Sequence, residues 1–267
     1  MKKPILRVFL VLVLTFSTWL VYPDSALQLL AKCKEALAEI KTVQLKGKTI
    51  TGSIDITFEE GAIDYVNKFF VAIDKKDSKI LSSIYYKDNH TYLFDSDSNS
   101  WFKFEKGSTF ASSFFDKAKI FSAFPDDPSG TGFVITFAGE EEIENLTCYR
   151  IQSNIFDREL AKLYIQKNLN RFVPEEIADL LRQDKAMLNS YLDTYTQNPV
   201  SMVWFSKDSF LLVKVLTKYR QIIGPDESIP IQREIVYYGH NKPVKGEIPQ
   251  AALESAALST DDFNLGQ

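Results

Sequence analysis

Histidine and cysteine are scarce in this chain, with two of each among 267 residues. Both histidines, His90 and His240, fall in predicted turns, and the sequence has no G-x-S-x-G elbow, H-E-x-x-H motif or glycine-rich phosphate loop. A Ser-His-Asp triad would need one of these histidines, and two cysteines are too few for a catalytic or metal-binding cysteine cluster. We therefore expect a protein that is not an enzyme and carries no cofactor or metal, while carboxylate pairs assembled by folding stay open.

An excess of positive charge is also missing. The formal net charge is -4 and the pI is near 5.4, which gives no electrostatic case for a nucleic-acid partner. Hydrophobic residues make up 45% of the chain and charged residues 25%, as in a folded globular protein of one large or two small domains. Aromatic residues are plentiful, with 20 Phe and 12 Tyr, and they recur on predicted strands.

The sequence has no apolar run of the length that an ordinary membrane span requires. Three basic residues within the first seven precede an apolar run over residues 8–21, and Pro23 follows. The run is shorter than the ~20 apolar residues of a transmembrane helix, and this pattern is typical of an export signal. We predict that residues 1–23 are a cleaved signal peptide or an uncleaved anchor. The rest of the chain should be extracytoplasmic, either secreted or held near the membrane by its N-terminus.

The two cysteines, Cys33 and Cys148, leave two interpretations open. Lipidation of Cys33 is rejected, because it follows Lys32 and lies well past the apolar run, inside a predicted helix. An exported protein can keep a disulfide, and a bridge between Cys33 and Cys148 would pin the first helix to a strand. Two buried free thiols are the alternative.

Residues 84–105 are the most informative stretch of the chain. Three aromatic runs, at residues 84–86, 92–94 and 101–104, are separated by turns rich in Asn, Asp and Ser. Aromatic side chains favour half-buried strands, and these short polar side chains favour turns. The stretch therefore predicts an antiparallel meander with large rings on one face. Helices, another sheet or an apolar ligand must cover that face.

The second turn of this meander imitates the start of a calcium-binding loop, with Asp95, Asp97 and Asn99 at alternate positions. The match fails where such loops are strict, because position six is Ser100 in place of glycine and position twelve is Lys106 in place of glutamate. We predict a solvated hairpin turn without a metal.

The spacing of apolar residues predicts a few helices among many short strands. Ser25 and Gln28 fit a capping box at the start of a helix over residues 26–40. Phenylalanines at near-helical spacing predict a short helix within residues 110–124, and residues 157–195 are predicted as a helical insertion.

About ten or eleven short strands, joined by hairpins and turns such as one at residues 59–61, favour a single antiparallel sheet. A sheet of that many strands tends to curl. The predicted fold class is α+β: a curved antiparallel half-barrel covered on its concave face by helices.

In order and in local phrases, this arrangement resembles the LolA-like fold of bacterial lipoprotein carriers and of the related mycobacterial LppX/LprG-type lipid-binding lipoproteins. Residues 26–45 are similar to the family's first helix and first strand, and residues 92–103 to its display hairpin. Residues 202–214, MVWFSKDSFLLVK, and residues 237–249 resemble a later hairpin and the closing phrase. The chain departs from the lipidated members because it lacks a usable lipobox cysteine.

The resemblance implies one LolA-like domain over residues 24–251. Large apolar residues are scarce beyond Pro249, so residues 252–267 are predicted to be a flexible tail. The resemblance also implies a binding protein that holds a lipid, an acyl chain or a lipid-bearing protein in an apolar cleft between the half-barrel and its helices. The alternative is an envelope-sensing or protein-interaction module of the same fold with a filled cleft. Side chains that either line the cleft and its lid or simply form core are Tyr92, Phe94, Trp101, Phe104, Phe110, Phe114, Phe115, Phe121, Leu163, Leu180 and Trp204.

Overall fold

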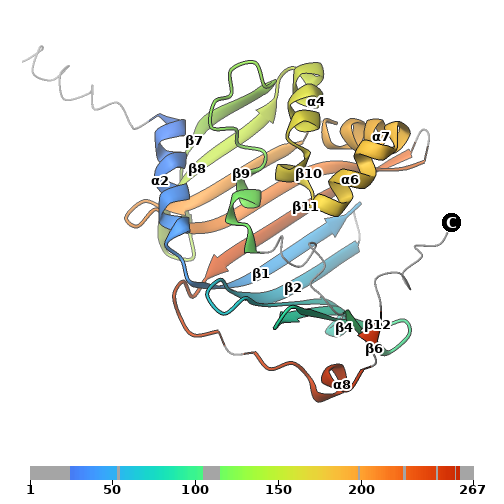
Figure 1. Cartoon of the computed structure of the whole chain (residues 1–267). Coiled ribbons are helices and arrows are strands. Elements are labelled where there is room, and N and C mark those ends of the chain that lie inside the picture. The colour runs from blue at the N-terminus through green and yellow to red at the C-terminus, as the bar shows by residue number, and fades with distance from the viewer. Residues whose placement is uncertain are drawn as a thin grey trace, which may run out of the picture.

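The computed structural model describes residues 25–52, 55–104, 115–197, 199–224, 227–244, 246–255 and 257–258. Within them, one open sheet has the strand order β12-β6-β5-β4-β3-β2-β1-β11-β10-β9-β8-β7 (Figure 1). The strands from β1 to β11 pair antiparallel with their neighbours, and β12 pairs parallel with β6. The strands are β1 (Thr42–Thr51), β2 (Asp55–Asp64), β3 (Phe69–Lys76), β4 (Lys79–Lys87), β5 (His90–Asp95), β6 (Ser100–Phe104), β7 (Phe133–Ile143), β8 (Leu146–Ile155), β9 (Val200–Ser206), β10 (Leu212–Gly224), β11 (Glu227–Tyr238) and β12 (Ala257–Leu258).

Few helices accompany this sheet, so the predicted α+β class with one large antiparallel sheet is confirmed. The predicted helical insertion contains four consecutive helices. The helices are α2 (Ala26–Ala38), the 3-10 helix η2 (Lys117–Phe121), α4 (Arg158–Lys167), α5 (Leu169–Phe172), α6 (Glu175–Gln183), α7 (Lys185–Tyr195) and α8 (Gln250–Leu253). Among the described residues, no helix combines the length and apolarity that a membrane span requires.

The first helix begins as its sequence predicts. The backbone N–H of Gln28 donates to Ser25 Oγ at 3.2 Å, and the Ser25 N–H donates to Gln28 Oε1 at 2.7 Å. This capping box satisfies N–H groups that the first turn leaves without a helical partner. The apolar stripe of α2 is buried and consists of Leu29, Leu30, Cys33 and Leu37.

The turn predicted at residues 59–61 is wrong, because these residues lie inside β2. Gly61 is paired with Leu45 on one side and with Ala72 on the other. A Cβ at Gly61 would lie 2.5 Å from the carbonyl oxygen of Val71. The glycine therefore permits a close approach of two strands, and the chain turns later, at residues 65–68.

Side chains alternate between two faces of the sheet, as they must on a strand. The inner face carries Leu45, Ile63 and Val203, which form one buried cluster with residues of α2 such as Leu30. The opposite, outer face carries two smaller buried clusters, one that includes Tyr92 and one that includes Trp204. The main core therefore lies between the inner face and the helices.

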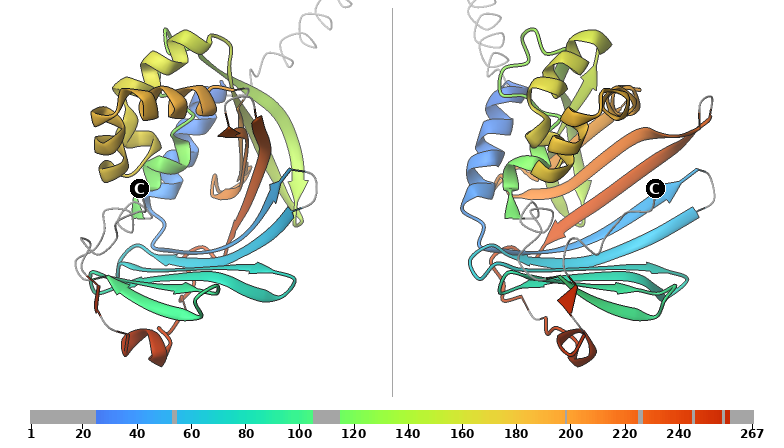
Figure 2. Two further views of the ribbon diagram at one scale, coloured as in Figure 1. Left: turned by 90° about the vertical axis from the view of Figure 1, so that its right-hand side faces the viewer. Right: turned by 45° about the vertical axis from the view of Figure 1, so that its right-hand side comes forward.

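The sheet curves around its inner face, and the helices of the insertion gather over one half of it (Figure 2). Helix α2 contacts β7 and η2, and α7 contacts β10. In the insertion each helix contacts the next one along the chain, and α4 also contacts α7. Strands β1 to β6 extend beyond this group (Figure 2).

The end of the described chain returns along the outer face. Val244 and Ile248 pack against the outer cluster around Tyr92, and Ala252 of α8 is fully buried in it. Strand β12 then pairs with the edge strand β6. The boundary predicted at residue 252 thus falls inside α8, while residues 259–267 and the predicted signal or anchor at residues 1–23 lie outside the described residues.

Candidate functional site: the inner face of the sheet

The meander predicted from residues 84–105 is present as β4, β5 and β6. In its register Leu93 is paired with Ile84 on one side and with Phe102 on the other. Paired residues share a face, and Ile84 packs against the main inner cluster. Leu93 and Phe102 therefore lie on the inner face. Both are only partly buried, and neither packs against a core cluster formed by the described residues.

Of the predicted meander rings, Phe104 lies on the same inner face, because it is paired with Thr91, two residues before Leu93. Sequence reasoning missed Leu93 and Phe102, although they occupy the alternate positions of the same two strands. Period-two spacing defines two faces but does not say which one is turned inward.

Tyr92, Phe94 and Trp101 occupy the outer face, so their prediction as cleft residues is corrected. The ring centroids of Phe94 and Trp101 lie 5.2 Å apart, and those of Tyr85 and Trp101 lie 5.9 Å apart. The cover of Tyr92 and Trp101 is the chain's own C-terminal segment, through Val244, Ile248 and Ala252.

Trp204 is also an outer-face residue, which corrects its predicted place in the cleft. It is buried with Cys148, Val213 and Leu216. Its neighbours in the strand, Val203 and Phe205, point the other way into the main core. The indole ring lies under the ammonium of Lys214, 5.0 Å from its centroid.

The predicted lid phenylalanines fall into two groups. Phe110 and Phe114 lie outside the described residues. Phe121 belongs to η2, is 2% exposed and is part of the main core. Phe115 packs against that core, with its ring centroid 5.3 Å from that of Tyr86. Both described members of the group therefore serve as core on the inner side of the sheet.

Leu163 of α4 and Leu180 of α6 were predicted to face the cleft, and the structure leaves them exposed at 53% and 49%. Each helix buries its other side: α4 through Ala161 and Ile165, and α6 through Ala178 and Leu181. The two leucines therefore do not take part in the contact between helices and sheet.

The disulfide considered for Cys33 and Cys148 is absent, because both thiols are free and buried. Cys33 belongs to the main cluster on the inner side, whereas Cys148 belongs to an outer-face cluster. The sheet therefore separates them. Burial raises the pKa of Cys33 to about 12, so this thiol stays protonated and unreactive at neutral pH.

The inner face also carries charged side chains, on β2 and β11. Arg233 Nη2 donates to Glu59 Oε2 at 2.5 Å. Removal from water lowers the pKa of Arg233, but the charge of Glu59 and its hydrogen bond outweigh this and raise it. The Tyr237 ring lies next in the strand on the same face, where burial raises its pKa. An ion pair thus stands on the inner face beside the apolar region.

The imitation of a calcium loop forms a turn. Asp95 accepts the N–H and the hydroxyl of Ser98 at 3.0 and 2.7 Å, and these hydrogen bonds lower the pKa of Asp95. In the described ranges, no three His, Cys, Asp or Glu side chains lie close enough together to hold a metal ion.

No family model and no curated protein matches this sequence. Solved structures do match. The lipoprotein LppX of Mycobacterium tuberculosis is 14% identical, covers 83% of this chain and 98% of its own, and has a TM-score of 0.50. LprF from Mycobacterium bovis is 12% identical, with coverages of 85% and 97% and a TM-score of 0.45. A LolA superfamily protein from Nitrosomonas europaea is 11% identical, with coverages of 84% and 96% and a TM-score of 0.28.

The match to LppX agrees with the resemblance expected from the sequence. At such identities, a likeness speaks for the fold alone, and the match to LppX carries that conclusion. The chain has the LolA/LppX-like fold, an open antiparallel sheet accompanied by a few helices.

Proposed function

We propose that the protein is an exported, non-enzymatic binding protein that holds an acyl chain along the inner face of β4, β5 and β6. The acyl chain would belong to a lipid or to an acylated partner protein, and it would lie on the part of the concave face that extends beyond the helices of the insertion (Figure 2). The observation that carries this proposal is the pair Leu93 and Phe102. These two apolar side chains lie on the inner face of the meander, partly buried and outside the core clusters of the described residues.

The energetics favour an acyl chain on such a surface. Each methylene removed from water contributes about 0.8 kcal/mol, so a chain of ordinary length gains useful affinity without a specific polar contact. Ile84, Leu93 and Phe102 lie side by side on three adjacent strands, which gives a continuous apolar strip. The Arg233–Glu59 ion pair stands on the polar part of the same face.

Location outside the cytoplasm supports the same proposal. The basic residues and apolar run in residues 1–23 have the pattern of an export signal, and LppX, whose fold the chain shares, is a lipoprotein. An acyl chain outside a bilayer exposes its apolar surface to water, which is unfavourable. A binding protein outside the cytoplasm could remove that surface from water.

The test is uptake of a fluorescent fatty acid by the purified protein, with Phe102→Ser as the variant and Phe94→Ser as its matched control. Both substitutions remove one phenylalanine ring from the same hairpin, but Phe94 is on the outer face. We expect Phe102→Ser to weaken uptake about tenfold, the equivalent of two or fewer lost methylene contacts, and Phe94→Ser to leave it unchanged. Equal loss in both variants, with their folds intact by circular dichroism, contradicts a site on the inner face.

The interaction module remains a second candidate function, favoured by the packing of part of the inner face. Phe121, Leu37 and Leu45 are buried in the main cluster, so the protein's own side chains fill that part of the inner face and leave no room for an acyl chain between sheet and helices. Native mass spectrometry of the purified wild-type protein separates the two candidates. Acyl species bound to the protein support carriage. A lipid-free protein that also takes up no fatty acid supports the module.

A further inference from the structure

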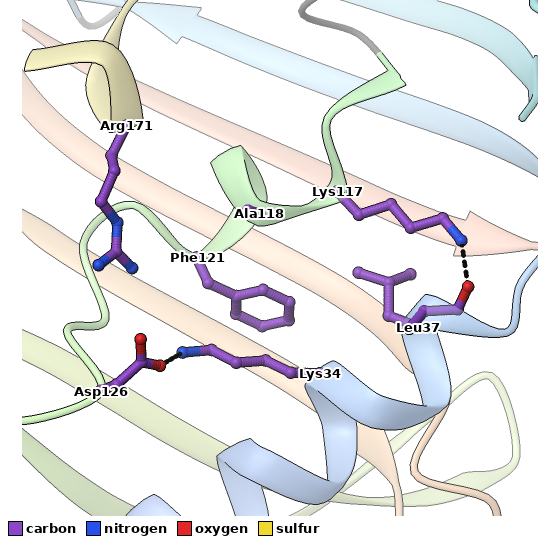
Figure 3. A pocket seen from close by; sticks show the side chains of 8 residues that line it. Lys34, Leu37, Lys117, Ala118, Phe121, Asp126 and Arg171 are labelled. Atoms are coloured by element: carbon purple, nitrogen blue, oxygen red, sulfur yellow. Dashed lines mark hydrogen bonds and ion pairs between the residues drawn. The ribbon is translucent and has the colours of Figure 1, made fainter.

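A recess lies between α2, η2 and α5, apart from the apolar strip on β4, β5 and β6 (Figure 3). Its volume is about 270 Å³. A water molecule occupies about 30 Å³ of the liquid, so the recess has room for roughly nine water-sized groups and is too small for a full acyl chain. It is lined by Lys34, Leu37, Ala38, Lys117, Ala118, Phe121, Asp126 and Arg171.

Positive charge exceeds negative charge in this lining. Three cationic side chains, Lys34, Lys117 and Arg171, face a single carboxylate, Asp126. Lys34 Nζ and Asp126 Oδ1 form an ion pair at 2.5 Å. The hydrogen bond from Lys34 lowers the pKa of Asp126, and the charge of Arg171 adds to this effect. One carboxylate neutralises one of the three cations, which leaves two positive charges in the recess.

The two remaining cations differ in how far the protein itself engages their donors. Lys117 Nζ donates to the carbonyl oxygens of Ala38 and Ile40, both at 2.7 Å, and lies 4.5 Å from the centroid of the Tyr65 ring, so the protein already occupies this group of three N–H donors. Arg171 Nη1 donates to the Tyr164 hydroxyl at 3.1 Å, and a guanidinium group has five. Burial lowers the pKa of Lys117, and the opposing effect of the Glu39 charge does not outweigh it.

The rest of the lining is carbon. Leu37 and Phe121 form the floor, and Figure 3 shows Arg171 and the Lys34–Asp126 pair on one side of the Phe121 ring with Lys117 on the other. The exposed methyl groups of Ala38 and Ala118 complete the wall. The aliphatic stems of Lys34 and Lys117 add apolar surface below their charged ends.

We propose that this recess is a binding site for a small organic anion, namely a carboxylate carried on a short hydrocarbon stem. The stem would rest on Leu37, Phe121 and the two alanine methyls, and the carboxylate would accept hydrogen bonds from Arg171, while the charge of Lys117 across the recess adds to the attraction. A guanidinium group matches the two oxygens of a carboxylate in a bidentate pair. The site is separate from the acyl strip proposed on β4, β5 and β6, and it needs no ligand there.

The probe is hexanoate, whose eight non-hydrogen atoms fit roughly nine water-sized groups, and its matched neutral analogue is 1-hexanol. Ligand-observed NMR titration of the purified full-length protein should show saturable binding of hexanoate in roughly the millimolar range. Binding should weaken as salt is added, because the cations are near the surface and are screened. We expect 1-hexanol to bind about tenfold more weakly, since it cannot use the charged donors.

Two variants locate the site. Arg171→Gln removes one cation and should weaken hexanoate binding about tenfold. Ala118→Leu keeps every charge and fills the recess, so it should abolish binding. Lys185→Gln is the control, because Lys185 is exposed at the start of α7 and does not line the recess; it should bind hexanoate like the wild type. Thermal unfolding establishes that each variant is folded before it is titrated.

The proposal is overturned if hexanoate does not saturate, if 1-hexanol binds as tightly, or if folded Arg171→Gln and Ala118→Leu bind like Lys185→Gln. Inorganic phosphate is a further arm. Phosphate that competes as well as hexanoate also overturns the proposal, because the hydrocarbon stem would then contribute nothing. The outcome is independent of the acyl-chain site. Phe102→Ser should leave hexanoate binding unchanged, and Arg171→Gln should leave uptake of the fluorescent fatty acid on the strip with Leu93 and Phe102 unchanged.

Discussion

The indole N–H of Trp204 donates to Glu141 Oε2 at 2.9 Å and ties β9 to β7 across the intervening β8 on the outer face of the sheet. The same oxygen accepts a hydrogen bond from Arg150 Nη1 at 3.1 Å. Trp204 is 3% exposed, so water cannot replace Glu141 as the acceptor of its N–H. The contact fixes the side of the sheet on which this large ring lies, away from the acyl strip.

Trp204→Phe should therefore lower stability without changing ligand uptake. The substitution removes one hydrogen bond to a charged acceptor and part of a buried ring, and we expect a loss of about 1–3 kcal/mol in the free energy of unfolding. Glu141 keeps its ion pair with Arg150, which limits the loss. Urea unfolding measures the first effect and fluorescent fatty acid uptake the second. A folded Trp204→Phe protein with impaired uptake would show that the ligand reaches the outer face.

Local sequence signals predicted the elements well and their orientation poorly. The Ser25–Gln28 capping box and the meander are visible in the sequence, because both depend on neighbouring residues. Which face of a strand points inward could not be predicted in the same way. Strand β5 carries Tyr92 on one face and Leu93 on the other, and both faces of the meander are apolar. Alternation alone cannot rank two apolar faces.

Covers supplied from far along the chain were also hidden from local patterns. Tyr92 and Trp101 are covered by Val244 and Ile248, about 150 residues later in the sequence. The separation of the cysteines has the same origin, because the sheet that divides them is assembled from the whole chain. The Arg233–Glu59 ion pair joins β11 to β2, the two strands that flank β1. No short sequence motif predicts this pair.

Gly132, which directly precedes β7, should be hard to replace because its backbone packs against the start of the helical insertion. Its carbonyl oxygen accepts the N–H of Phe156 at 3.0 Å, and its φ of +76° is in the left-handed region. A Cβ there would lie 2.3 Å from the carbonyl oxygen of Asp157 and 2.5 Å from the backbone nitrogen of Ala161. Gly132→Ala would push the first turn of α4 away from β7, and we expect a loss of more than about 3 kcal/mol in the free energy of unfolding.

Gly130→Ala is the matched control for this prediction. Gly130 has a φ of +67°, but a Cβ there would meet no atom within 4 Å. Its replacement carries only the left-handed strain, roughly 1 kcal/mol. Urea unfolding of the two variants separates backbone strain from the steric clash. Equal losses in the free energy of unfolding would mean that α4 can shift away from a Cβ at position 132 at little energetic cost.

Both thiols should be free in the native protein even under oxidising conditions. Cys33 and Cys148 have no exposed surface, and they lie on opposite sides of the sheet. Alkylation in denaturant, followed by mass spectrometry, should therefore add two groups to protein that was never reduced, while native protein should add none. A protein that takes up two groups only after reduction would contain the bridge and would contradict this packing.

Stability should fall at alkaline pH. Removal from water raises the pKa of Cys33 from 9.0 to about 12, and that of Tyr65 and of Tyr195 from 10.0 to about 12. In each case the folded pKa is above the unfolded one, so the unfolded state loses its proton first as the pH rises. The resulting stabilisation is fully present below about pH 9 and is lost between about pH 9 and 12.

Tyr195→Phe tests this account, because phenylalanine fills most of the same space and has no proton to lose. The variant should be less stable than the wild type near neutral pH, since it lacks the hydroxyl that hydrogen-bonds with Ser122. Above about pH 10 its free energy of unfolding should fall less steeply, by up to roughly 1.4 kcal/mol for each pH unit, the value of one proton. Urea unfolding at a series of pH values measures both slopes, with Tyr238→Phe as a control because the Tyr238 ring is exposed. Parallel slopes for the wild type and Tyr195→Phe would show that the hydroxyl of Tyr195 ionises as readily in the folded protein as in the unfolded chain.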